Sequence, residues 1–78
     1  MKDTLANIKD KSGNSVYFGD KFLAYMVRPS HEVGTLVTVV EDLSEENISC
    51  DRNFDVEDGK GNRIWNAYMV ITGGTRKD

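Results

Sequence analysis

Few side chains in this sequence have the types and spacing that catalysis requires. His31 lies in a loop signalled by Pro29, between Ser30 and Glu32. A catalytic histidine needs a nucleophile and an orienting partner, and residues adjacent in sequence rarely align for proton transfer. We therefore interpret His31 as an exposed loop residue. No acid, base and nucleophile stand out together, so the sequence does not predict an enzyme.

An acidic segment near the middle of the chain could hold a cation or line a strand. Asp51, Asn53, Asp55 and Glu57 alternate, as oxygen ligands do at the start of an EF-hand loop. That loop also needs a glycine at its sixth position and a glutamate at its twelfth, where this chain has Asn62. Because apolar residues separate the acids, we predict a strand with one solvated face. No metal or cofactor is predicted.

The chain contains one cysteine, Cys50, and therefore no internal disulfide. An activated thiolate requires cations or a helix N-terminus nearby, whereas the neighbours of Cys50 are a serine and an aspartate. We predict a half-buried structural residue. One cysteine and one histidine also cannot supply the usual ligand sets of a zinc site.

An internal repeat is the clearest signal of architecture. Residues 8–17, IKDKSGNSVY, are echoed by residues 56–65, VEDGKGNRIW, and each copy is followed by Ala-Tyr-Met-Val, at 24–27 and 67–70. The shared Asp-x-x-Gly is a turn signal, because the aspartate hydrogen-bonds back to the chain and the glycine accepts a positive φ. The repeat predicts a turn followed by a strand, used twice.

The remaining pattern predicts an all-β domain. Apolar and β-branched residues at strand spacing predict strands over residues 22–28, 35–40, 48–51, 54–56 and 63–72. Ser44 is the expected N-cap of a single helical turn. We predict a small SH3-like barrel of five or six short antiparallel strands, with two related hairpins and at most one short helical turn. Residues 1–78 form one domain, with 1–4 and 73–78 expected to be flexible.

Composition places this domain among ordinary small folded proteins. The chain has 78 residues, of which 38% are hydrophobic and 29% charged, with a net charge of −3. Residues 41–58 carry eight acids against Arg52, between mildly basic ends. This distribution is the opposite of what general phosphate binding requires, and it suits a basic protein partner or solubility. No apolar run is long enough to cross a bilayer, and the sequence shows no signal peptide, so we expect a cytoplasmic protein without a membrane partner.

The run from Asp10 to Asp20, DKSGNSVYFGD, resembles the opening of small phage and prophage proteins of the YopX-like and related SH3-like barrel type. Those proteins often begin with Asp-Lys-x-Gly-x-x-Ile-Tyr-x-Gly-Asp before an apolar strand, and the match covers residues 8–28. The resemblance implies an SH3-like barrel and a viral or mobile-element origin, but no activity. A looser resemblance, at Gly19 and Asp20, is to SH3-like domains that bind RNA or RNA polymerase, although their basic loop is missing here.

The aromatic residues could be a stacking platform or part of the core. Single-stranded nucleic acid stacks on such platforms, but in so small a chain aromatics more often fill the core. Tyr17 and Trp65 occupy equivalent repeat positions, which favours a structural role for both. Phe18, beside Gly19, is the aromatic that we expect to be exposed.

These observations favour a non-enzymatic binding module. With the origin that the resemblance implies, this module is a phage-encoded protein that docks onto a host protein and modulates it. In this hypothesis the acidic segment meets a basic surface of the partner, with Phe18 as an anchor. The partner-binding residues that we predict are Phe18, Arg28, His31, Asp42, Glu45, Glu46 and Arg63. Two alternatives remain: a domain associated with nucleic acid or RNA polymerase, and a structural phage component that forms homo-oligomers.

Overall fold

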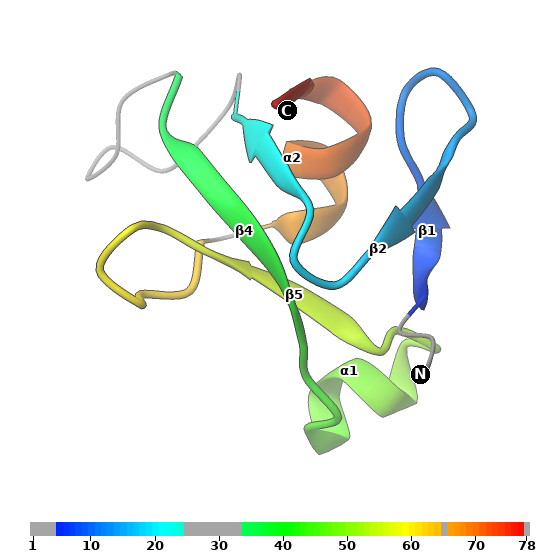
Figure 1. The fold of residues 1–78 in the computed structure, drawn as a ribbon. Helices are drawn as coiled ribbons and strands as arrows, with labels where there is room; N and C mark the ends of the chain where they lie inside the picture. The colour runs from blue at the N-terminus through cyan, green and yellow to red at the C-terminus, as the bar shows by residue number, and fades with distance from the viewer. Residues whose placement is uncertain (1–4, 25–33, 65, 78) are drawn as a thin grey trace.

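The computed structural model describes residues 5–24, 34–64 and 66–77. Their elements, in chain order, are β1 (Leu5–Lys9), β2 (Ser15–Tyr17), β3 (Lys21–Leu23), β4 (Leu36–Glu41), α1 (Glu45–Ser49), β5 (Phe54–Glu57), α2 (Ala67–Gly73) and β6 (Thr75–Lys77). Strands β1 and β2 form an antiparallel hairpin, and the others form an antiparallel sheet in the order β5-β4-β3-β6 (Figure 1). The prediction of a small, mainly β domain of short antiparallel strands is confirmed.

The two copies of the Asp-x-x-Gly motif fold into the same turn. In each copy, Oδ1 of the aspartate accepts hydrogen bonds from main-chain N–H groups two and four residues later, at 2.8 to 3.0 Å. The main-chain N–H of the glycine donates to the aspartate carbonyl in both. Gly13 and Gly61 each have a φ of 85°, which glycine adopts without strain. The sequence repeat is therefore a structural repeat at its turns.

Side chains join the β1–β2 hairpin to the larger sheet on two sides. The Asn53 amide, just before β5, pairs with the main chain of β1: Nδ2 donates to the Leu5 carbonyl at 3.1 Å, and Oδ1 accepts from the Asn7 N–H at 2.9 Å. From β6, Nη2 of Arg76 donates to the carbonyl of Ser15 in β2 at 3.1 Å. Main-chain groups of β1 and β2 thus form hydrogen bonds with the Asn53 and Arg76 side chains, where in the sheets the partner is a neighbouring strand.

One core lies between the hairpin, the inner face of the sheet and α2. Alternate residues of β4 and β5 point inward, as expected for strands with one covered face. The buried apolar residues are Ala6, Val16, Phe22, Ala24, Val37, Val39, Phe54, Val56, Ile64, Ala67, Val70 and Ile71. Each element except α1 and β6 contributes to this set, so the core organises nearly the whole described chain.

Helix α2 replaces the strand predicted over residues 63–72, and that prediction is wrong. Its buried residues Ala67, Val70 and Ile71 have the spacing of one helix face. Asn66 precedes the helix in the left-handed region, and its Oδ1 accepts a 3.2 Å hydrogen bond from a main-chain N–H of the first turn. With α1, the described chain has two short helices, so the limit of one helical turn is also corrected.

Three further predictions, for residues 75–77, Ile48 and Cys50, are also wrong. Residues 75–77, predicted to lie in a flexible tail, form β6, which pairs with β3. Ile48 belongs to α1 instead of opening a strand over residues 48–51. Cys50 follows this helix and is exposed, not half-buried. Predictions for 1–4 and for the strand beyond Ala24 fall outside the described residues.

Candidate protein-binding surface

Two large apolar side chains are exposed beside each other at α1. Leu43 and Ile48 retain 59% and 56% of their accessible surface. Together with Glu45, Glu46 and Ser49 they line a shallow hollow of about 590 Å³. Burying an apolar side chain of this size stabilises a protein by roughly 1.5 to 3 kcal/mol. A small domain that leaves two such residues in water therefore has an apolar area available for a partner.

A buried amide explains why Ile48 points outward. Asn47 is the buried residue of α1, and its Nδ2 donates to the carbonyl of Asp42 at 3.1 Å. Its Oδ1 accepts a 2.8 Å hydrogen bond from Nε of Arg52, whose guanidinium lies 5.8 Å from the centre of the Phe54 ring. The helix is thus anchored through polar contacts. The side chain that follows the buried amide is left on the exposed side of this short helix.

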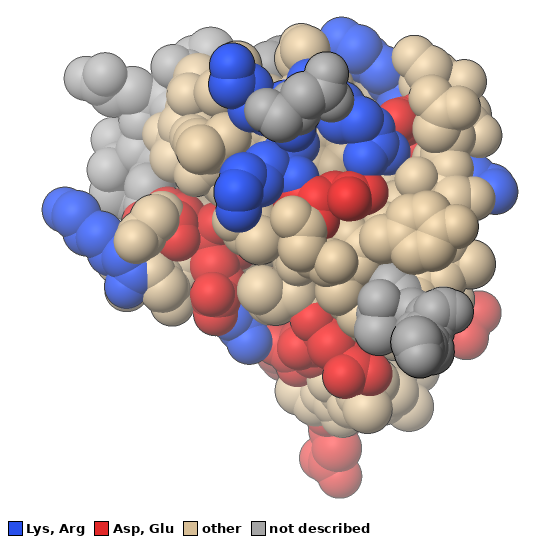
Figure 2. Space-filling model, viewed as in Figure 1, with Lys and Arg blue, Asp and Glu red and all other residues tan. Residues whose placement is uncertain are grey.

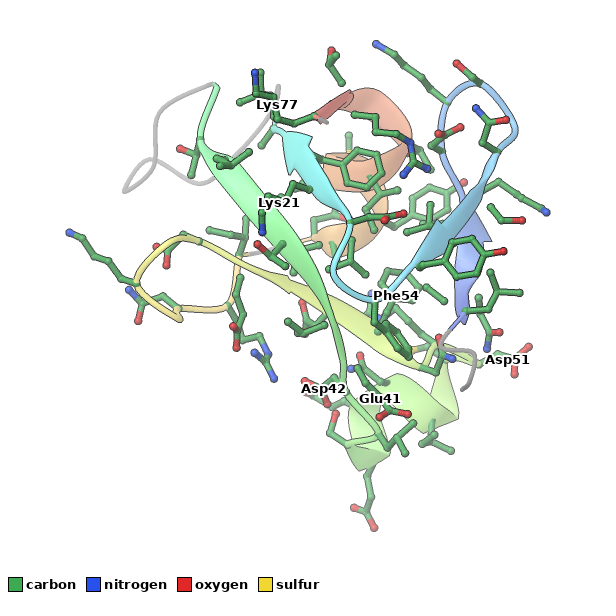
Figure 3. All side chains as sticks on the ribbon, in the orientation of Figure 1. Lys21, Glu41, Asp42, Asp51, Phe54 and Lys77 are labelled. Carbon is green, nitrogen blue, oxygen red and sulfur yellow. The ribbon has the colours of Figure 1, made fainter. Side chains whose placement is uncertain are left out.

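Carboxylates surround the apolar pair. Glu41, Glu45, Glu46 and Asp51 are exposed, and none of them forms an ion pair with the described part of the chain. Acidic side chains gather at the α1 end of the molecule, where Glu41 lies below Phe54 and Asp51 lies to its right (Figures 2 and 3). The field around the hollow is therefore negative and favours cationic partners.

A second group of acids, next to this end, is already neutralised in part by Arg63. Its guanidinium contacts Asp42 at 3.1 Å, Asp55 at 3.9 Å and Glu57. The main-chain N–H of Ser44, followed by the Ser44 hydroxyl and Arg63, lowers the pKa of Asp42, so this carboxylate stays charged at neutral pH. Asp42 and Arg63 thus hold the start of α1 against β5.

Two of the alternating acids in residues 51–57, Asp55 and Glu57, are partners of Arg63. Asp55 and Glu57 alternate with buried Phe54 and Val56 along β5, so the predicted strand with one solvated face is confirmed for residues 54–57. Asp51 and Asn53 precede this strand, and there the prediction is wrong. In the parts of the chain that the structure describes, no three His, Cys, Asp or Glu side chains are grouped to hold a metal ion. The same parts contain no helix with the length and apolar character needed to cross a bilayer.

The structure brings some of the predicted site residues together and separates others. Asp42 and Arg63 form an ion pair, and Glu45 and Glu46 are exposed on the adjacent helix. Phe18, expected to be an exposed anchor, is only partly exposed and packs against the core. Arg28 and His31 fall outside the described residues.

The exposed aromatics are not the expected ones. Tyr17, predicted to be a core residue, is exposed on β2, and Tyr68 is exposed on α2. Tyr25 and Trp65 fall outside the described residues. Because Tyr17 precedes Phe18 in the chain and the two point to opposite sides, burial of one exposes the other.

Sequence reasoning missed Leu43 and Ile48, the residues that distinguish this surface. They are the large apolar residues in the otherwise polar stretch 41–53. The sequence predicts a strand at Ile48, and a strand prediction does not indicate that this side chain is exposed on a helix. The signal that could have revealed them is the single helical turn predicted at Ser44. So short a helix buries few side chains, and apolar residues in or beside it are left exposed.

Comparison with protein-family models, curated proteins and solved structures finds no match for this chain. The function is therefore argued from the surface itself.

Proposed function

We propose that this protein is a non-enzymatic module that binds a basic protein surface. The contact is made by Leu43, Glu45, Glu46 and Ile48, which we call the α1 surface. The observation that carries this proposal is the exposure of two large apolar side chains beside carboxylates that form no ion pair with any described residue. The sequence predicts that the whole acidic segment, residues 41–58, meets a partner. The proposal narrows this contact to α1 and the residues just before it.

The two kinds of side chain have different roles in this mechanism. Leu43 and Ile48 supply affinity, because water leaves their surface when a partner covers them. Glu45 and Glu46 attract lysine or arginine and disfavour acidic partners, which raises the rate of encounter and sets specificity. Binding of this kind weakens with salt, since at ionic strengths near 0.1 M exposed charges more than roughly 10 Å apart are largely screened from each other.

The identity of the partner rests on the resemblance of residues 8–28 to phage proteins. That resemblance implies a viral or mobile-element origin, and for such a protein the partner we propose is a host protein in the host cytoplasm, whose activity the module alters by covering part of its surface. The proposal for the α1 surface does not depend on this origin, because it follows from the chemistry of the exposed residues.

The proposal is tested with a defined probe. A labelled peptide of alternating lysine and leucine is titrated into the full chain, and backbone amide shifts are followed by NMR. We expect the largest shifts at residues 43–49, with affinity that falls as salt is added. A peptide in which glutamate replaces lysine should produce no such shifts. Shifts confined to other elements, or none, would overturn the proposal.

Two matched variants separate the α1 surface from general stickiness. Ile48→Ser should weaken peptide binding several-fold, whereas Leu36→Ser, which changes another exposed aliphatic residue, should not. The double variant Glu45→Lys, Glu46→Lys should abolish binding of the lysine peptide while leaving the circular dichroism spectrum unchanged. Equal affinity of all three variants would contradict the assignment.

A second candidate function, binding of nucleic acid, is supported by exposed lysines at the opposite end of the molecule. Lys21 and Lys77 are directly opposite each other in β3 and β6, and Lys11 reaches Thr75 of β6, with Nζ 3.5 Å from Oγ1. Figure 2 shows basic side chains gathered in this region. Retention on immobilised single-stranded DNA that falls steeply with salt would support this candidate.

A further inference from the structure

The chain carries a basic surface that complements its own α1 surface. On the outward face of the larger sheet, Lys21 is the register partner of Lys77, and Leu23 is the register partner of Leu36. These four residues, called here the lysine surface, combine two ammonium groups with an apolar pair. The α1 surface combines two carboxylates with an apolar pair. The two surfaces therefore match in the number and kind of groups they offer.

The lysines of this surface are available for a partner. Lys21 and Lys77 are exposed, and neither forms an ion pair within the described residues; Nζ of Lys21 donates only to the Thr38 hydroxyl, at 3.2 Å. Like charges directly opposite each other on neighbouring strands destabilise a sheet. An acidic partner placed over both lysines would remove that repulsion.

The three arginines in the described part of the chain cannot serve this purpose, because each already binds side chains of the same molecule. Arg52 is bound to Asn47, Arg63 to three acids, and Arg76 to Asp10 and Asp20. These guanidinium groups thus hold parts of one molecule together, whereas Lys21, Lys77 and the acids of α1 form no ion pair within the described residues. This division leaves opposite free charges at separate places on the molecule.

The two surfaces lie toward opposite ends of β4. Leu36, which belongs to the lysine surface, begins that strand, and Glu41 ends it just before α1. In Figure 3, Lys77 lies near the top of the molecule, Lys21 lies nearer its middle beside β4, and Glu41 and Asp42 lie below both, toward α1. A contact between one copy's α1 surface and the next copy's lysine surface therefore leaves one free surface on each copy.

We propose that copies of this chain associate head to tail, with the α1 surface of one copy covering the lysine surface of the next. This inference rests on the proposed function, since it names a second copy as the basic partner. The contact is heterologous, so it continues into a ring or an open chain instead of stopping at a symmetric dimer. Leu43 and Ile48 meet Leu23 and Leu36, while Glu45 and Glu46 meet the lysines.

Sedimentation velocity of the full chain over a wide concentration range tests the inference. At low salt, the average mass should rise continuously with concentration, and added salt should return it toward the monomer. A monomer mass at every concentration at low salt overturns head-to-tail association. In that event the proposed function is judged separately, because lysine–leucine peptide binding at residues 43–49 does not require self-association.

Two double variants determine which surfaces are in contact. Lys21→Glu with Lys77→Glu, and Glu45→Gln with Glu46→Gln, each damage one surface, so each variant alone should stay close to the monomer mass. Mixed in equal amounts, they should form pairs of twice the monomer mass and no larger species, because only one intact contact is possible. A mixture that remains monomeric, or that forms long chains, contradicts the arrangement.

A charge-matched control removes two other exposed lysines. Lys9→Glu with Lys60→Glu makes the same change in net charge at positions outside both surfaces. This variant should associate as the unmodified chain does, and loss of its association would show that net charge, not the lysine surface, governs the effect. If single-stranded DNA binds through Lys21 and Lys77 while the protein alone stays monomeric, the lysine surface belongs to nucleic acid and the inference fails.

Discussion

The turns at Asp10 and Asp58 have the same sequence motif and the same hydrogen bonds, but different structures follow them. After the first turn the chain forms β2, whereas after the second it makes a single bridge between Glu57 and Arg63 and then enters α2. The local motif determines the turn, because its aspartate and glycine form hydrogen bonds with main-chain groups of the same five residues. It does not determine the next element, which depends on contacts made elsewhere.

The arginines near these two turns show the same contrast. Nε and Nη2 of Arg76 contact Oδ2 of Asp10 at 3.1 and 2.9 Å, and Nη1 contacts Asp20 at 2.6 Å. The side chains of Arg76 and Asp10 are 31% and 6% exposed. Arg63, which follows the second turn, is 44% exposed and gathers its acids on the outer face of the sheet. The first turn is therefore built into the fold, and the second region lies on its surface.

The largest effect should come from removing the arginine that docks the first turn. Arg76→Leu removes contacts to two carboxylates and to the Ser15 carbonyl, and the cation–π contact with Phe22 at 5.0 Å. Since hydrogen bonds to charged groups contribute about 2 kcal/mol, we expect at least about 2 kcal/mol less free energy of unfolding. Urea denaturation followed by circular dichroism measures this loss.

Arg63→Leu is the matched control, because it also removes one guanidinium from several acids. Exposed ion pairs contribute little, so the expected loss is below about 1 kcal/mol. Equal losses for the two variants would contradict the distinction between a docked region and a surface region.

The same distinction explains how far sequence reasoning could succeed. The Asp-x-x-Gly turns, the strand at β4 and the alternation in β5 were predicted because each depends on neighbouring residues. Ser44 was also correctly placed at the start of a helix, although Asp42 Oδ1, not the serine side chain, accepts the hydrogen bond there, from the Ser44 N–H. In these segments local chemistry and tertiary structure agree.

Predictions were wrong where tertiary contacts decide the structure. The second Ala-Tyr-Met-Val resembles the first, so it was assigned to a strand, although Asn66 and the spacing of Ala67, Val70 and Ile71 are those of a capped helix. Strand β6 has no apolar residue, and its position depends on Arg76 and on pairing with β3. Nothing in a three-residue polar segment signals such a role.

A smaller and equal effect is expected at the glycines that the two turns share. Gly13→Ala and Gly61→Ala place a side chain in the left-handed region without a steric clash, since an added Cβ would have no heavy atom within 4 Å. Each should cost about 1 kcal/mol of stability, the penalty for that backbone conformation. Gly59→Ala, outside that region and equally uncrowded, is the control and should cost less. A larger loss at Gly13 would show that docking strains the first turn further.

The smallest effect concerns pH and again separates the docked turn from the rest. The N–H of Asn14, together with Arg76 and the N–H of Ser12, lowers the pKa of Asp10 against the opposing effect of burial. Because the pKa is lower in the folded state, the unfolded chain takes up the proton first as the solution becomes acidic. The resulting stabilisation is fully present above the unfolded pKa of about 3.9 and is lost as pH falls through the folded pKa.

Asp10→Asn removes this titration while keeping a side chain of the same shape. The variant should be less stable than the unmodified chain at neutral pH, and the difference should shrink as the pH falls below about 4. Urea denaturation at a series of pH values measures both curves. A difference that stays constant down to the most acidic pH would show that the Asp10 charge does not stabilise the first turn. Convergence of the two curves would instead identify that charge as part of what docks this copy of the repeat into the fold.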